Sequence, residues 1–504
     1  MRSNPLIYEV NAWLWLKRWQ QRLGLDIGLG EVPEEALTEL TAAMPDVVWL
    51  MGVWRRSAAG VQQALTHLAL QQEYRSALPD VRAADISGSP YAIGDYQVAP
   101  ELGGEDSLQK LRRRLSARGI KLMLDLVPNH VAIDHPWLLT NPDAFIQVSA
   151  QQVATQTQHH DGSRSYFVQP QSGQGFAHGR DPYFPPWTDT AQLDAQSVVY
   201  RRLLTQTLQH MTTLCDGVRC DMAMLLVQRI FARTWGLREG RLTTELWPEV
   251  IGATRAVRPD FVFAAEVYWD MESELQGMGF DYTYDKRLYD RLVADDQDGV
   301  RDHLLAQLSY QQHLLRFVEN HDEPRAMTAL GSPRFRAAAV LSLSLPGARL
   351  VFMGQLEGRR TKLPVQLARE PLELPEPQVR DFYRRLLAAL RDDVFHNGQF
   401  FLLGNRPYLG KDRSHESLLA HAWQLEDQLR VVVCNLGSHK ASGRVALPPL
   451  PSQTHWRFVD LLHDNIAPVF SAQELCVQGL PIFLDAYDAH VFEVQPAHAG
   501  GAAS

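Results

Sequence analysis

Short apolar runs alternate with longer amphipathic stretches through the first three quarters of the chain. A short apolar run predicts a buried strand, whereas apolar positions three or four residues apart, as in 107–118 and 198–214, predict a helix. The predicted strands are residues 7–10, 47–50, 121–127, 217–221, 261–267, 282–284, 315–318 and 350–353. Strands and helices in this alternation predict an α/β fold, a (β/α)8 TIM barrel.

Two regions depart from this alternation. Residues 132–194 are rich in Gln, Pro, Gly and His and show little helical periodicity. A structureless loop of this length is uncommon inside a compact domain, so we expect an inserted subdomain after the third strand. Beyond residue 392, short alternating runs separated by turn residues predict a C-terminal antiparallel β-sandwich. The predicted domains are therefore the first part of the barrel (1–131), the inserted subdomain B (132–194), the second part of the barrel (195–392), the β-sandwich (393–497) and a disordered tail (498–504).

Composition adds expectations about location and partners. A chain of 504 residues is too long for one ordinary core, and its net charge of −9 gives no reason to expect nucleic acid or an anionic membrane as a partner. Residues 1–19 lack the apolar region of a signal peptide, and the apolar run at 337–353 is interrupted by Pro346, Gly347 and Arg349. The four cysteines lack metal-ligand spacing. These features predict a cytoplasmic protein with free thiols and no membrane span.

Polar side chains follow the third, fourth, fifth and seventh predicted strands, at the point where each apolar run ends. The four segments are LDLVPNH (124–130), DGVRCDMAM (216–224), FAAEVYW (263–269) and FVENHDEPR (317–325). Active sites of TIM barrels are built at the C-terminal ends of the strands and in the loops that follow them. We therefore expect the polar residues of these four segments to meet in one site.

Two carboxylates in these segments suit a double-displacement reaction. Arg219 and Asp221 are two residues apart, so both point to the same side of a strand, and an arginine favours the ionised form that a nucleophile needs. Glu266 follows an apolar run, where partial desolvation would favour the protonated form that a general acid needs. Retaining glycosidases use such a pair about 5–5.5 Å apart.

Further residues in the same segments suit sugar binding. Asp322 would bind sugar hydroxyls and help to distort the ring, and His321 and His130 would donate hydrogen bonds to the same sugar. Asp125 fits a sugar contact and a role in barrel scaffolding equally well. Each of these patterns also has a structural interpretation, as an ion pair, a strand-end cap or a turn. Their joint occurrence at four strand ends favours a catalytic site.

The four segments resemble, in order, the four signature regions of the α-amylase superfamily, glycoside hydrolase family 13. The resemblance covers nearly the whole barrel and implies that Asp221 is the nucleophile, Glu266 the general acid/base and Asp322 the transition-state stabiliser. It also assigns the sugar-binding residues Arg219, Asp125, His130, His321 and Tyr91. Tyr91 belongs to SPYAIGDY, which is similar to the family's aromatic segment after the second strand. Core packing is the alternative interpretation of Tyr91.

The departures from the family pattern limit the functional prediction. Many starch-degrading members carry a Lys-His pair after the nucleophile, where this chain has the apolar AMLLV at 223–227. Asn129 matches one calcium ligand of the family, but its acidic partners are not identifiable, so we expect no required cofactor and keep calcium as an alternative. A basic loop after the eighth strand carries Arg359, Arg360 and Lys362, which are either solvated or in contact with the leaving group.

The sequence therefore predicts a retaining α-glycoside hydrolase that acts on a short α-glucoside or maltooligosaccharide through a covalent glycosyl-enzyme. Transfer of the glucosyl unit to a sugar or small polyol is the alternative. A non-catalytic carbohydrate-binding homologue is less favoured because all three carboxylates are present. A metal-dependent barrel enzyme is also less favoured, because it would need clustered histidine and carboxylate ligands and this chain has no third histidine at a predicted strand end. Substrate linkage, chain length and oligomeric state are not specified by the sequence.

Overall fold

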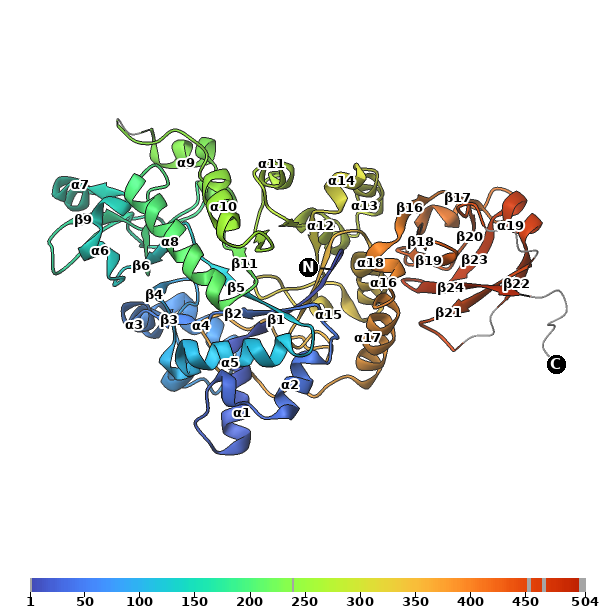
Figure 1. Ribbon diagram of the computed structural model, residues 1–504, viewed down its shortest axis with the longest axis horizontal. Helices are drawn as coiled ribbons and strands as arrows, with labels where there is room; N and C mark the ends of the chain where they lie inside the picture. Colours follow the sequence, from blue (N-terminus) through green and yellow to red (C-terminus); the bar gives the residue numbers. More distant parts are fainter. Residues whose placement is uncertain (1, 238–239, 451–454, 465–467, 498–504) are drawn as a thin grey trace.

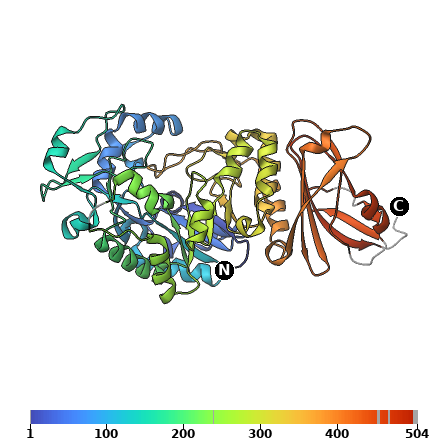
Figure 2. The same cartoon turned by 90° about the horizontal axis from the view of Figure 1, so that it is seen from above.

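The computed structural model of the protein describes residues 2–237, 240–450, 455–464 and 468–497. Three parts follow one another along the long axis of the molecule (Figures 1 and 2): an inserted segment at one end, a barrel in the middle and a pair of β-sheets at the other end. The prediction for residues 498–504 lies outside the described residues.

Eight parallel strands close into a barrel in the order β1-β15-β14-β13-β12-β11-β5-β2. Their side chains are almost all buried, which explains why the sequence presents them as short apolar runs. The barrel strands are β1 (Leu6–Asn11), β2 (Val47–Met51), β5 (Lys121–Leu126), β11 (Gly217–Cys220), β12 (Val262–Ala265), β13 (Tyr282–Tyr284), β14 (Leu314–Arg316) and β15 (Ala348–Phe352). The predicted (β/α)8 barrel is confirmed, and each predicted strand overlaps one of these.

Helices between the strands pack around the barrel, and local capping sets where two of them begin. The Asn11 side chain accepts hydrogen bonds from the backbone of Trp13 and Leu14 at the start of α1, and Ser197 caps α8 through the Tyr200 N–H. These helices are α1 (Ala12–Leu23), α2 (Glu34–Thr41), α3 (Ala58–Thr66), α4 (Leu68–Ala77), α5 (Gly104–Ser116), α8 (Val198–Leu214), α9 (Gln228–Trp235), α10 (Leu246–Val257), α11 (Glu272–Gly277), α12 (Lys286–Val293), α13 (Gln297–Leu304), α14 (Leu308–Gln311), α15 (Ala326–Ala329), α16 (Gly331–Ser344), α17 (Pro377–Leu390) and α18 (Val394–Asn397). Among the described residues, no helix is both long and apolar enough to cross a membrane.

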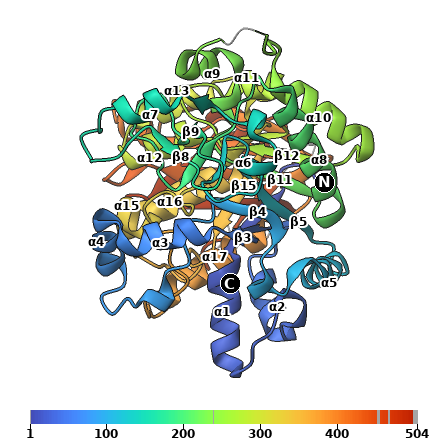
Figure 3. The same cartoon turned by 90° about the vertical axis from the view of Figure 1, so that its left-hand side faces the viewer.

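The chain between β5 and β11 forms small antiparallel sheets before it continues into the barrel helix α8. One sheet pairs β6 with β10, and the other has the order β7-β9-β8 (Figure 3). The elements are β6 (His130–Ala132), α6 (Trp137–Thr140), β7 (Gln147–Val148), α7 (Ala150–Thr155), β8 (Tyr166–Val168), β9 (Gly175–Ala177) and β10 (Thr190–Gln192). A further antiparallel pair, β3 (Trp54–Arg56) and β4 (Ile93–Val98), follows β2. The region that lacked helical periodicity thus has secondary structure of its own.

The C-terminal part consists of two antiparallel sheets with the orders β16-β18-β19-β24-β21-β22 and β17-β20-β23. Apolar side chains of both sheets share one core, as a β-sandwich requires. The elements are β16 (Gln399–Leu403), β17 (Asn405–Pro407), β18 (Leu418–Leu425), β19 (Gln428–Asn435), β20 (Ala441–Val445), β21 (His455–Asp460), β22 (Val469–Ser471), α19 (Ala472–Gln478), β23 (Leu480–Leu484) and β24 (Ala489–Ala497). The exact domain borders stay predictions.

Candidate active site

The register of three neighbouring barrel strands brings the predicted site residues together. The last residues of β11 and β12 are paired, so Asp221 and Glu266, which follow them directly, lie side by side at the C-terminal ends of the strands. On the other side of β11, Arg219 pairs with Asp125 of β5. The sequence could not specify this register, but it placed each residue at the end of the correct strand.

Arg219 connects three carboxylates. Its Nη1 lies 2.8 Å from Asp221 Oδ1, and its Nη2 lies 2.8 Å from Glu266 Oε2 and 3.7 Å from Asp322 Oδ2. Its Nε donates to the Tyr284 hydroxyl at 3.2 Å. The guanidinium is fully buried, so these contacts replace its hydration. The acids predicted from three separate segments therefore surround one buried cation.

The two central carboxylates are held differently. Glu266 accepts at both oxygens: Oε2 from the Met222 N–H at 2.7 Å, and Oε1 from the Tyr268 hydroxyl at 2.7 Å. Met222 adopts the left-handed conformation, with φ of 44°, as its N–H meets this carboxylate. Asp221 is bound through Oδ1, whereas its Oδ2 accepts no hydrogen bond from the described residues. One oxygen of Asp221 therefore remains available to a substrate.

Burial raises the pKa of Asp221 to about 8, with the charge of Glu266 as the second cause. Arg219 lowers the pKa of Asp221, as predicted, but it does not outweigh these two effects. Arg219 therefore favours the ionised form, as expected, while burial and Glu266 together have the larger effect on the pKa of Asp221. Two adjacent buried carboxylates resist simultaneous ionisation, so the pair retains a proton near neutral pH.

Asp322 and His321 form the more open side of the site. The Asp322 side chain is 39% exposed, and its Oδ2 lies 3.0 Å from His321 Nε2. Burial alone would raise the pKa of Asp322, but His321 and then Arg219 lower it to about 2. His321 Nδ1 is paired with Glu9, and burial is outweighed by Asp322 and Glu9, so its pKa is well above the usual value. His321 is therefore held as a cation between two carboxylates.

Glu9 and Tyr268 were not predicted as site residues. Glu9 is fully buried on β1 and contacts His321. Its signal was present in the sequence, because an acidic residue inside the run LIYEVN needs a buried partner. Tyr268 lies two residues after Glu266 in the segment FAAEVYW (263–269), and only the structure shows that its hydroxyl turns back onto that carboxylate.

Tyr91 lies in this network and is partly buried. Its hydroxyl is 2.7 Å from His321 Nε2, and the two rings are stacked with their centroids 5.3 Å apart. The Arg219 guanidinium carbon lies 5.3 Å from the centroid of the Tyr91 ring. Tyr91 thus contacts two of the groups that surround the carboxylates, and its role in stacking on a sugar stays a prediction.

Asp125 and His130 are more deeply enclosed. Asp125 Oδ2 accepts from the Gly52 N–H at 2.9 Å, while Oδ1 is buried without a hydrogen-bond partner among the described residues. Burial raises the pKa of Asp125 to about 6 against the effect of Arg219. Burial also lowers the pKa of His130 to about 4, and its ring packs against Trp187 with centroids 5.0 Å apart. His130 is therefore neutral near pH 7 and lies behind the Tyr91 loop, whose backbone it contacts.

The surroundings of Asn129 do not fit a calcium site. Gln192 Nε2 donates to the Asn129 backbone oxygen at 2.9 Å and to its Oδ1 at 3.0 Å. An amide N–H group thus occupies the position next to both oxygens, where a cation would have to lie. Calcium needs six to eight oxygen ligands. The one family ligand recognised in the sequence is therefore used in a side-chain amide pair.

The segment after Asp221 and the basic loop differ in their relation to the site. The apolar residues of AMLLV form a buried turn of 3₁₀-helix (Ala223–Leu226) and offer no polar group to a leaving sugar. In the basic loop, Arg359 is paired with Glu370. Arg360 is paired with Glu376 at 2.8 Å. Lys362 alone of the three predicted cations reaches the site, where its Nζ donates to the Asp322 backbone oxygen.

Two exposed aromatic rings, from the loop after Glu266 and from the inserted segment, contact each other. Trp269, three residues further along the chain, is 38% exposed, and Tyr183 of the inserted segment is 57% exposed. Their ring centroids are 5.1 Å apart in an edge-to-face arrangement. Trp269 also has a positive φ of 63°. Aromatic rings exposed to water in this way suit ligand binding more than core packing.

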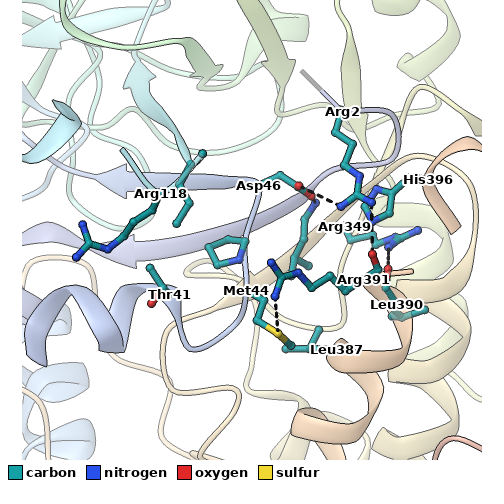
Figure 4. Close-up of a pocket in the computed structure, with 14 residues that line it drawn as sticks. Arg2, Thr41, Met44, Asp46, Arg118, Arg349, Leu387, Leu390, Arg391 and His396 are labelled. Atoms are coloured by element: carbon teal, nitrogen blue, oxygen red, sulfur yellow. Dashed lines mark hydrogen bonds and ion pairs between the residues drawn. The ribbon is translucent and has the colours of Figure 1, made fainter. Parts of the chain in front are cut away.

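A cavity of about 390 Å³ opens at the opposite end of the barrel (Figure 4). It is lined by residues at the N-terminal ends of the strands, among them Asp46 and Arg349. Arg349 donates to the backbone oxygens of Leu390 and Phe395 at 3.1 and 2.8 Å, and Arg2 lies 3.9 Å from Asp46. The contacts of Arg349 join the start of β15 to α17 and α18, and the cavity is separate from the acid cluster.

Comparisons with known proteins agree with this architecture. Residues 80–274 match the family model described as "Alpha amylase, catalytic domain". The chain is 26% identical over 386 residues to α-amylase MalA of Haloarcula japonica, covering 74% of this chain and 51% of that protein. The chain spans about half the length of the curated relatives it matches.

Solved structures are similar over nearly the whole chain. A noncanonic maltogenic α-amylase, AmyB, from Thermotoga neapolitana superposes with a TM-score of 0.67 at 17% identity, covering 97% of this chain and 98% of that one. An α-amylase from Geobacillus thermoleovorans complexed with acarbose gives a TM-score of 0.66 at 16% identity, covering 98% and 99%. At these identities the similarity establishes the fold.

Proposed function

Because the chain belongs to the α-amylase superfamily, we propose that it is a retaining glycoside hydrolase that cleaves a short α-glucoside or maltooligosaccharide. The observation that carries this proposal is the binding of one buried guanidinium, Arg219, to Asp221, Glu266 and Asp322. A fixed acid beside a carboxylate with a free oxygen is the arrangement that double displacement needs.

In the first step, Asp221 Oδ2 attacks the anomeric carbon while the bond to the leaving oxygen breaks. Glu266 gives its proton to that oxygen, and the products are a covalent glycosyl-enzyme and the free leaving group. The proton is the one that the Asp221–Glu266 pair retains, and it must reside on Glu266 when Asp221 attacks. Glu266 Oε1 suits this role because its partner, the Tyr268 hydroxyl, can accept a hydrogen bond as well as donate one.

In the second step, water attacks the anomeric carbon and gives a proton to Glu266, and the bond to Asp221 breaks. Two inversions at the same carbon return the α-configuration. Arg219 stays bound to Asp221 Oδ1 throughout and stabilises the carboxylate as it leaves. Asp322, which His321 and Arg219 keep ionised, stabilises positive charge on the ring in both transition states.

The surroundings of the acids support a short substrate. Tyr91 offers a ring to the sugar that is cleaved, and Trp269 with Tyr183 offers rings to the neighbouring sugar. The buried AMLLV turn supplies no polar contact for a long starch chain. We propose further that catalysis requires no calcium, because the Gln192 amide already satisfies both oxygens of Asn129.

Transfer to a sugar or small polyol is the second candidate. The exposed Trp269–Tyr183 pair favours it, because a ring platform that retains an acceptor sugar would compete with water for the glycosyl-enzyme. Hydrolysis and transfer share the first step and differ only in the nucleophile of the second.

The test is to incubate the enzyme with maltotriose and follow the products by proton NMR. We expect glucose and maltose to appear first as the α-anomer, and no turnover with Asp221→Asn. Longer oligosaccharides would favour transfer over hydrolysis. A β-anomer as the first product, or full activity of Asp221→Asn, would contradict the proposed mechanism.

A further inference from the structure

Two histidines and an aspartate meet in the C-terminal sandwich, far along the molecule from the acid cluster. Asp460 ends β21, His463 lies in the turn that follows, and His490 lies on the adjacent strand β24 (Figure 1). Their ligand atoms all lie within 4.8 Å of one another. We propose that Asp460, His463 and His490 bind a divalent metal ion of the zinc class.

The donor atoms point to one place. Nδ1 of His463 and Nδ1 of His490 lie 2.7 and 2.6 Å from the same oxygen, Oδ2 of Asp460. Two imidazoles and one carboxylate are a common protein ligand set for zinc. An ion held about 2.0–2.1 Å from each atom would separate the donors to roughly 3.3 Å. Each of the two oxygen–nitrogen distances would therefore lengthen by roughly 0.6–0.7 Å to receive the ion.

Backbone and carboxylate contacts already orient these ligands. The Leu462 N–H donates to Asp460 Oδ1 at 3.0 Å, which leaves Oδ2 to face the histidines. On the far side of the ring, His463 Nε2 lies 3.4 Å from Asp488 Oδ1, which itself accepts from the Ala489 N–H at 2.9 Å. A metal-binding histidine almost always has its second nitrogen bound to such an acceptor. Asp488 fixes the ring so that Nδ1 points at Asp460.

The cluster has a route to solvent. A cavity of about 430 Å³ between α17 and the sandwich is lined by His463 and Asp488, together with Phe382 and Arg385 of the helix. Arg385 is bound to Asp381 and Asp464 at 3.1 and 2.6 Å, so its charge is already balanced by two carboxylates. An ion can enter from this cavity, and water from it can complete the coordination. Bound metal would fasten the turn after β21 to β24 beside the barrel helix.

The experiment uses full-length protein that has been dialysed against EDTA and then titrated with Co²⁺, a spectroscopic substitute for zinc. We expect one Co²⁺ per chain with visible absorption bands, displacement of the bands by one equivalent of Zn²⁺, and a zinc-dependent rise in Tm. His490→Gln and Asp460→Asn should lose the bands. His439→Gln removes an exposed histidine of the same sandwich and should keep them.

Asp488→Asn tests the orienting role and should weaken Zn²⁺ binding about 10–100-fold without abolishing it. Circular dichroism shows whether each variant is folded, and His463→Gln replaces Asp460→Asn if the latter does not fold. The proposal is overturned if wild type binds no stoichiometric Co²⁺, or if His490→Gln and His463→Gln bind it as wild type does. Turnover of maltotriose at the Asp221 site does not depend on this outcome, since the two sites are separate.

Discussion

At the residue scale, the chemistry depends on how one buried cation divides its bonds among three acids. Arg219 occupies one oxygen of Asp221 and one of Glu266, and lies at a greater distance from Asp322. Removing Arg219 would leave these buried acids without their shared cation, which typically costs about 3–5 kcal/mol. The cluster therefore acts as one unit, and its protonation has to be described for the Asp221–Glu266 pair instead of for either acid alone.

This shared proton predicts the alkaline limit of activity. Because the pKa of Asp221 is raised to about 8, the pair keeps a proton below that pH and has none to donate above it. We expect kcat/KM for an aryl α-glucoside to fall as the pH rises through about 8. Activity that stays constant to about pH 10 would show that the proton donor is not this pair.

The same proton affects stability, which provides a control that does not depend on turnover. Between about pH 4 and pH 8 the folded protein binds a proton that the unfolded Asp221 has lost, so this group's contribution to stability decreases as the pH rises. Asp221→Asn removes the effect. The variant should gain about 1–3 kcal/mol relative to wild type between these pH values, measured by urea unfolding.

At the element scale, the loops that follow the strands carry the residues that we propose to contact the sugars. The loop after β12 carries Glu266, Tyr268 and Trp269 within four residues, and Trp269 contacts Tyr183 of the inserted segment. The inserted segment thus completes the site from outside the barrel. Its position also encloses the neutral His130 behind the Tyr91 loop.

Trp269→Ala tests the role of this aromatic pair. We expect KM for maltotriose to rise about three- to tenfold, as loss of one aromatic contact costs about 0.5–1.5 kcal/mol. The rate on an aryl α-glucoside, which has no second sugar, should change less than about twofold. Phe184→Ala, at an exposed ring next to Tyr183, is the matched control. Equal effects of both variants on both substrates would contradict the proposal that Trp269 and Tyr183 bind the second sugar.

At the scale of the whole molecule, the sandwich is attached to the barrel through helix α16. Trp423 and His421 of β18 both bind Ser344 at the end of that helix: Trp423 Nε1 donates to its backbone oxygen at 2.8 Å, and His421 Nε2 lies 2.9 Å from its hydroxyl. All three side chains are buried. The contact lies within an apolar cluster that the barrel and the first sheet of the sandwich share.

Trp423→Ala should lower the free energy of unfolding by about 3–5 kcal/mol, because it removes a buried ring and leaves the Ser344 oxygen without its donor. Trp423→Phe keeps most of the ring and should cost less, about 1–3 kcal/mol. Urea unfolding of both variants checks this order. If the two variants are equally stable, the ring does not anchor the sandwich.

Much of this fold followed from the sequence because the barrel strands are buried on both faces and appear as uninterrupted apolar runs. Asp221, Glu266 and Asp322 were recognisable because each follows such a run. The raised pKa of Asp221 could not be predicted from the sequence, since it depends on burial and on the distance to Glu266. The contacts of Glu9 and Tyr268, and the Gln192 amide on Asn129, depend on side chains from separate segments that only the register brings together.

The covalent intermediate on Asp221 is the central claim, and trapping it is the most direct measurement. A 5-fluoro-α-glucosyl fluoride has a good leaving group and slows the second step, so the glycosyl-enzyme should accumulate. Mass spectrometry of the digested protein should find one added sugar, on the peptide that contains Asp221 and on that residue. A sugar attached to another residue, or fluoride release at a normal rate without any adduct in the intact protein, would contradict the account.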